Sequence, residues 1–154
     1  MENIDRIKKA KDLFCQGYSC SQAVVGAFCD VADMDFKIAI RLSSSFGGGM
    51  GGLRETCGAV TGMFMITGLV LGYESPTDNN IKKEHYAIIR SLADKFKSEH
   101  DSIICHELLS SLPGKLKQDP SPRTDEYYKA RPCIRFVETA AKLLDELLRE
   151  NNIY

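Results

Sequence analysis

The stretch "TCGAVTGMFMITGLVLGY" (residues 56–73) contains no charged side chain over 18 consecutive positions. That length is borderline for a helix that spans a membrane. Glycines and threonines dilute its apolar character, however, so we expect a buried central helix rather than membrane insertion. Thr56 has the side chain of an N-cap residue, and we expect it to cap this helix.

Helical periodicity also dominates on both sides of this stretch. We expect a first helix that ends near Gly17, a second over 21–32 capped by Ser19 or Ser21, and a third that begins at Asp35. Further helices are predicted over 81–96, 103–112 and 133–148. The polar segment near 113–131 contains Pro120 and Pro122, which favour irregular structure. The sequence therefore predicts an all-α fold: a single domain (1–154) forming a bundle of about five to seven helices.

Charge and composition exclude some classes of function. The chain has 20 Lys and Arg residues against 21 Asp and Glu, a net charge of −1. A nucleic-acid-binding surface requires clustered positive charge, so we expect no nucleic-acid partner. The N-terminal residues lack the apolar core of a signal peptide, which leads us to expect a cytoplasmic protein.

A glycine-rich loop precedes the central helix and leads to Cys57. The loop glycines and the glycine after the cysteine are Gly47, Gly48, Gly49, Gly51, Gly52 and Gly58. We predict that they bind a cofactor or small anion, because such a loop can direct backbone N–H groups at one point. A thiol in the first turn of a helix ionises easily, so we expect Cys57 to have a low pKa. The alternative is that the glycines only allow tight helix packing.

Six cysteines are many for an intracellular chain of this size, and disulfides are rare inside cells. Metal binding or redox chemistry is therefore expected of some of them. Cys20 and Cys133 lie at predicted helix starts, and Cys105 lies near the start of another. Cys15 and Cys29 receive no role, and His106 is placed near the site only by its position beside Cys105.

The cysteine pattern resembles a known family. The motif "CGAVTG" (57–62), preceded by "FGGGMGG", together with Cys20, Cys105 and Cys133, is similar to redox-active proteins named for their C_GCAxxG_C_C pattern. The resemblance extends from about residue 17 to residue 148. It implies a helical, anaerobe-associated redox protein whose functional set is Cys20, Cys57, Cys105 and Cys133. The family is also similar to part of the split-Soret cytochromes, but "IICH" (103–106) lacks the first cysteine of a c-type haem motif.

Four cysteines allow more than one chemistry. They are expected to hold an iron–sulfur centre, or to form one or two dithiol–disulfide pairs with Cys57 as the attacking thiolate. Structural zinc ranks below both, because the cysteines are far apart in the sequence. A different class of function is a non-catalytic module that binds a small anion at the glycine-rich loop. The redox partner cannot be identified from the sequence, and a helical bundle of this kind is compatible with a homodimer.

Overall fold

The computed structural model describes residues 4–154, which form helices and no β-strand. The all-α prediction is confirmed. The longer helices, of eight to 22 residues, are α1 (Arg6–Cys15), α2 (Cys20–Phe28), α3 (Phe36–Ser43), α5 (Gly58–Leu71), α6 (Asn79–His100) and α9 (Cys133–Glu150). Shorter elements are η1 (Cys29–Ala32), η2 (Ser44–Phe46), α4 (Gly47–Met50), α7 (Cys105–Leu108) and α8 (Asp125–Ala130).

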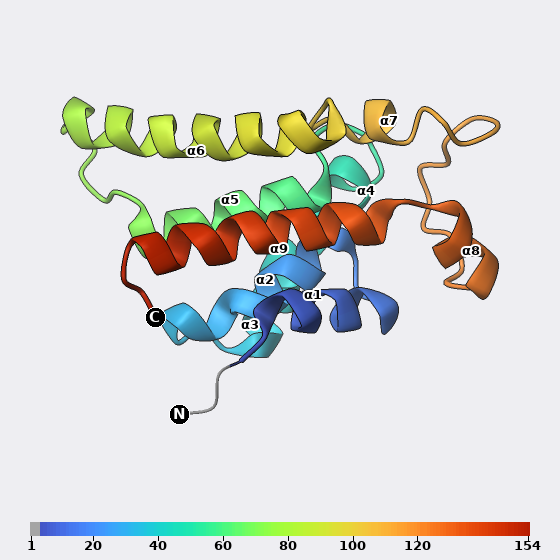
Figure 1. The fold of residues 1–154 in the computed structure, drawn as a ribbon, viewed down its shortest axis with the longest axis horizontal. Coiled ribbons are helices and arrows are strands. Elements are labelled where there is room, and N and C mark those ends of the chain that lie inside the picture. The colour runs from blue at the N-terminus through green and yellow to red at the C-terminus, as the bar shows by residue number, and fades with distance from the viewer. Residues whose placement is uncertain (1–3) are drawn as a thin grey trace.

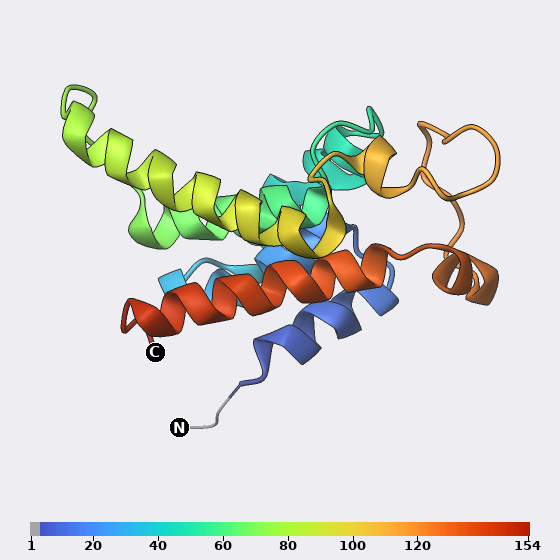
Figure 2. The same ribbon diagram turned by 45° about the horizontal axis from the view of Figure 1, so that its top comes forward.

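The long helices form a layered bundle. α5 and α9 pack against each other in the middle, with α6 on one side and α1, α2 and α3 on the other (Figures 1 and 2). α2 contacts α1, α3, α5 and α9 and therefore lies at the centre of the core. The N-terminal ends of α2, α5 and α9 lie toward the end of the bundle that carries α4, α7 and α8.

The central helix α5 packs closely against α2 because it carries glycines on that face. A Cβ atom added at Gly62 would lie 3.0 Å from the carbonyl oxygen of Ser21 and 3.1 Å from Cβ of Val24. α5 is thus a buried helix of the bundle, as expected from its sequence. Among residues 4–154, no helix is long and apolar enough to cross a membrane.

Helix capping agrees with the sequence at two sites and differs at a third. Ser19 caps α2 in a capping box with Gln22, and the Asp35 carboxylate accepts from the backbone N–H of Ile38 in α3. The prediction for Thr56 is wrong, because Cys57 itself is the N-cap residue of α5. Thr56 instead forms an antiparallel bridge with Ile104, which holds its backbone extended.

The segment expected to be irregular near 113–131 contains one helix. α8 (Asp125–Ala130) begins there because the Thr124 hydroxyl accepts from the backbone N–H of Tyr127. The helix predicted over 103–112 is shorter than expected, since α7 ends at Leu108. The loop after α7 leads to α8, and α8 lies next to the start of α9 at one end of the bundle (Figure 1).

Candidate functional site: a cavity lined by four cysteines

Four helix starts converge on one cavity and bring a cysteine each. Cys20, Cys105 and Cys133 are the first residues of α2, α7 and α9, and Cys57 is the N-cap of α5. All four line a cavity of about 60 Å³. Cys57, Cys105 and Cys133 are buried, and Cys20 is partly exposed. The structure therefore brings the whole predicted set together, from sequence positions up to 113 residues apart.

The side of the cavity that carries Cys57 and Cys105 is held by backbone pairing. The backbone N–H of Cys57 donates to the carbonyl of Ile103 (2.8 Å), and that of Cys105 donates to the carbonyl of Glu55 (2.6 Å). These two bonds flank the Thr56 and Ile104 bridge. A short antiparallel contact thus places two cysteines, 48 residues apart in the sequence, at one wall of the cavity.

The glycine-rich loop allows this close approach. A Cβ atom at Gly49 would lie 2.6 Å from Cβ of Cys105 and 2.9 Å from Cα of Arg54, and its φ of +67° also favours glycine. The backbone N–H groups of Gly52, Arg54 and Glu55 donate to carbonyls within the loop itself. These three amides are therefore not directed at the sulfur atoms, and the anion nest expected over 47–52 stays a prediction. The close approach of Gly49 to Cys105 and Arg54 agrees with the alternative that the glycines allow tight packing.

The glycines nonetheless contribute surface to the site. Gly48, Gly49 and Gly58 line the cysteine cavity. Gly47, Gly48, Gly51 and Gly52 line a second pocket of about 330 Å³, which shares six lining residues with the cavity and adjoins it. The role of these glycines in binding a ligand stays a prediction.

Cys20 and Cys133 are neighbours in the same cavity, and their thiols influence each other. The neighbouring thiol of Cys20 lowers the pKa of Cys133 to about 7, against the opposing effect of burial. Arg131, Arg123 and Arg54 lower it further by their positive charge. The pKa of Cys20 is raised well above its ordinary value, first by its interaction with Cys133 and then by burial. Cys133 therefore ionises first, and Cys20 keeps its proton.

The expectation that Cys57 is the acidic thiol is wrong. Burial raises the pKa of Cys57 to about 12, although the backbone N–H groups of Val60 and Ala59 oppose this rise. The first-turn amides of α5 are thus directed as expected, but they do not offset the loss of water around the sulfur. Burial also raises the pKa of Cys105, and the guanidinium of Arg54, with Nη1 3.8 Å from the Cys105 sulfur, opposes that shift.

Three arginines that the sequence did not single out as a group lie at the mouth of the cavity. Arg54, Arg123 and Arg131 line both the cavity and the adjoining pocket. Arg123 and Arg131 come from the polar segment before α9, which has no periodic pattern to indicate their position. Their proximity to Cys133 is a property of the folded chain.

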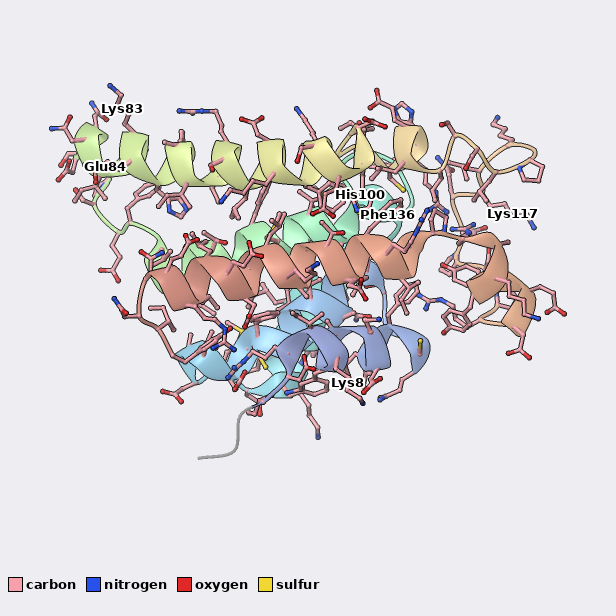
Figure 3. The ribbon with its side chains drawn as sticks, viewed as in Figure 1. Lys8, Lys83, Glu84, His100, Lys117 and Phe136 are labelled. Carbon is pink, nitrogen blue, oxygen red and sulfur yellow. The ribbon has the colours of Figure 1, made fainter. Side chains whose placement is uncertain are left out.

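The aromatic wall of the cavity comes from α9. Phe136 lines the cavity and packs edge-on against the ring of His100 from α6, with 4.9 Å between the ring centroids (Figure 3).

Arg54 is held by the loop after α7. The carbonyl of Lys117 accepts two hydrogen bonds from Arg54, at 3.1 Å from Nε and 2.5 Å from Nη2. This contact ties the loop after α7 to the glycine-rich loop.

The remaining cysteines and His106 lie elsewhere. Cys15 is exposed, and Cys29 is buried in the core, where its thiol donates to the carbonyl of Gly26 (3.4 Å). The side chain of His106 is exposed and is not among the residues that line the cavity. Among residues 4–154, no three Cys, His, Asp or Glu side chains are arranged around a point where a metal ion would bind. The iron–sulfur centre stays a prediction.

The fold and the cavity define an all-α protein with four clustered thiols, and comparison with known proteins agrees with this class. Residues 18–147 match the family model described as "Putative redox-active protein (C_GCAxxG_C_C)". The chain belongs to this family. No curated protein and no solved structure matches the chain. The relation to split-Soret cytochromes therefore stays an expectation.

Proposed function

We propose that this redox-active protein exchanges electrons between thiols and disulfides, with Cys133 as the attacking thiolate and Cys20 as the resolving thiol. The observation that carries the proposal is that Cys20 and Cys133 line the same small cavity, beside Arg54, Arg123 and Arg131. A thiolate attacks a disulfide best when its pKa is near the ambient pH. Cys133, with a pKa of about 7, meets this condition and Cys57 does not.

The reaction proceeds in two exchanges. The Cys133 thiolate attacks one sulfur of a substrate disulfide, the substrate S–S bond breaks, and one half leaves as a thiolate that takes a proton from water. Cys20 then gives up its proton and attacks the Cys133 sulfur. The mixed disulfide breaks, the second half leaves as a thiol, and Cys20 becomes joined to Cys133. Two electrons pass from the dithiol to the substrate.

Cys57 and Cys105 are suited to a later exchange rather than to the first attack. The charge of Cys133 affects the pKa of Cys20, Cys57 and Cys105 alike, which makes it the common neighbour of the other three thiols. Their raised pKa values keep Cys57 and Cys105 protonated and hence slow to react with a disulfide on Cys133.

An iron–sulfur centre held by Cys20, Cys57, Cys105 and Cys133 is the second candidate. One observation favours it: all four sulfurs line the same cavity, and four cysteine thiolates are the usual ligands of such clusters. When bound, the cluster would supply one-electron transfer. Anaerobic purification followed by iron and sulfide analysis tests this candidate, and matching iron and sulfide would replace the dithiol proposal.

The dithiol proposal is tested by trapping the first intermediate. In a Cys15→Ser background, which removes the exposed thiol, the chain is reduced and treated with 2-hydroxyethyl disulfide near neutral pH. We expect Cys20→Ser to accumulate a mixed disulfide on Cys133, because the resolving thiol is absent. The background chain should proceed to a disulfide between Cys20 and Cys133 without a lasting adduct.

Cys133→Ser is the complementary variant, and Cys29→Ser is the matched control for removing a buried cysteine outside the cavity. Cys133→Ser should form neither the adduct nor the internal disulfide, while Cys29→Ser should behave as the background chain. Circular dichroism checks that each variant stays helical. An adduct on Cys57 in the Cys20→Ser chain, or a normal rate of oxidation in Cys133→Ser, would contradict the proposal.

A further inference from the structure

The mouth of the cysteine cavity carries an excess of positive charge. Arg54, Arg123 and Arg131 line the adjoining pocket, and Asp119 is its one acidic lining residue. Among the described residues, none of the three arginines forms an ion pair with a carboxylate. The chain as a whole has a net charge of −1, so this local excess contrasts with the average surface.

Two of the arginines are fixed in place by the fold. Arg123 donates from Nη1 to the carbonyl of Phe14 and from Nη2 to the carbonyl of Tyr18, both at 3.0 Å. Arg54 is held by its two bonds to the Lys117 carbonyl. Carbonyl oxygens orient a guanidinium without neutralising its charge, so both side chains present preorganised positive charge to the pocket.

Arg131 differs from the other two. Its guanidinium lies over the ring of Tyr127, 4.9 Å from the centroid, and within residues 4–154 it donates no side-chain hydrogen bond. Its donors are therefore open to an anionic ligand, and a guanidinium is suited to bind carboxylates in a bidentate manner. Arg131 is also two residues before Cys133, so an anion bound there lies beside the reactive sulfur.

We infer that the adjoining pocket binds the anionic part of a small disulfide substrate and so directs its S–S bond to Cys133. The inference rests on the proposed function and adds the substrate class: a low-molecular-weight disulfide that carries carboxylate groups. The two volumes fit this class. The inner cavity of about 60 Å³ accepts little more than the reacting sulfur, whereas the pocket of about 330 Å³ is at the lower end for small-molecule sites.

The test compares three disulfides on one chain. The reduced Cys20→Ser protein is treated separately with dithiodipropionate (anionic), 2-hydroxyethyl disulfide (neutral) and cystamine (cationic), and adducts on Cys133 and on exposed Cys15 are timed by peptide mass spectrometry. The ratio of the two rates cancels the intrinsic reactivity of each probe, because both thiols meet the same reagent. We expect Cys133, relative to Cys15, to favour the anionic over the cationic probe by about tenfold at low salt.

Arginine variants show whether the pocket causes the preference of Cys133 for the anionic probe. Arg131→Gln should reduce the preference several-fold, and Arg135→Gln, which removes the same charge from the exposed face of α9, should leave it unchanged. High salt should also weaken it. The anionic-to-cationic ratio is insensitive to the thiolate fraction of Cys133, since one thiolate attacks both probes.

The outcomes separate the inference from the function on which it rests. If Cys133 forms no adduct with any probe, the proposed dithiol function fails. If Cys133 reacts with all three probes in the same order as Cys15, the dithiol function stands and the anionic substrate class is wrong. A preference that persists in Arg131→Gln and at high salt would also overturn the assignment of the pocket.

Discussion

The cysteine cavity contains two cysteines at helix starts, Cys57 and Cys133, whose thiol pKa values are shifted in opposite directions. On one side, Cys57 precedes the first turn of α5 and is buried, and its pKa is raised to about 12. On the other, Cys133 begins α9 and is also buried, and its pKa is lowered to about 7. Both sulfurs are near the positive end of a helix dipole, so the dipole does not explain the difference.

The difference arises from what else faces each sulfur. Cys133 is influenced by the neighbouring thiol of Cys20 and by the positive charge of three arginines, whereas Cys57 receives only backbone N–H groups against its burial. A charged form is stabilised in a buried site when donors and opposite charges replace the lost water. The comparison of Cys57 with Cys133 therefore shows that a helix start is not sufficient to make a thiol acidic.

The largest expected effect is a difference in alkylation rate between Cys133 and Cys57. At pH 7, about half of Cys133 is thiolate, against roughly one part in 10⁵ for Cys57, and the lower intrinsic nucleophilicity of the more acidic thiol offsets part of this difference. We expect a net advantage for Cys133 on the order of 100-fold. Timed labelling with iodoacetamide and peptide mass spectrometry measure both rates.

The same experiment as a function of pH sharpens the comparison. The Cys133 rate should rise with pH as the thiol loses its proton, with a midpoint near 7. The Cys57 rate should still be increasing at the highest pH at which the fold persists. Faster labelling of Cys57 than of Cys133 near neutral pH would reverse the roles of the two sides.

Gly49→Ala should have the largest effect on stability. The new Cβ would collide with Cys105 and the backbone of Arg54, and the residue has positive φ, so we expect a loss of about 2 kcal/mol in the free energy of unfolding. Gly68→Ala is the matched control: it lies in α5 with no neighbour within 4 Å, and should stabilise by roughly 0.5–1 kcal/mol. Urea denaturation measures both, and equal effects would mean that the close approach at Cys105 is unimportant.

The side of the cavity that carries Cys20 relies on a helix cap instead. Ser19→Ala removes the hydroxyl that accepts from the backbone N–H of Gln22 and should cost about 1 kcal/mol. Ser98→Ala, at an exposed position in α6, should change stability little. Thermal unfolding of the two variants compares them, and an unchanged Tm for Ser19→Ala would show that the cap does not hold this side.

The smallest expected effect concerns the charge on Cys133. Arg131→Gln removes one of the positive charges that stabilise its thiolate, so the midpoint of the labelling profile should move from about 7 toward the ordinary cysteine value. Arg135→Gln should leave the midpoint in place. A midpoint that does not move in Arg131→Gln would show that Arg131 does not contribute to the low pKa of Cys133.

Much of the fold could be predicted from the sequence because its signals are local. The uncharged stretch that became α5 and the caps Ser19 and Asp35 lie within one or two turns of the helices that they define. The error at the start of α5 has a non-local cause. Thr56 has the side chain of a cap, but a backbone pairing with Ile104, 48 residues away, moves the helix start to Cys57.

The cysteine set could be predicted from its pattern, but the chemistry of each thiol could not. Which sulfur is acidic depends on Cys20 and on Arg54, Arg123 and Arg131, which come from three separate parts of the chain. Arg123 and Arg131 belong to a polar segment without periodicity, so no sequence signal relates them to Cys133. The identity of the acidic thiol is therefore decided by tertiary structure.

The measurement that tests the central claim most directly is the location of the disulfide that forms at equilibrium. The chain with all six cysteines is incubated anaerobically in glutathione buffers from reducing to oxidising, quenched with acid, and mapped by peptide mass spectrometry. We expect the first disulfide to join Cys20 to Cys133, with Cys57 and Cys105 still reduced. A first disulfide between Cys57 and Cys105, or none at any ratio, would contradict the assignment of Cys20 and Cys133 as the working pair.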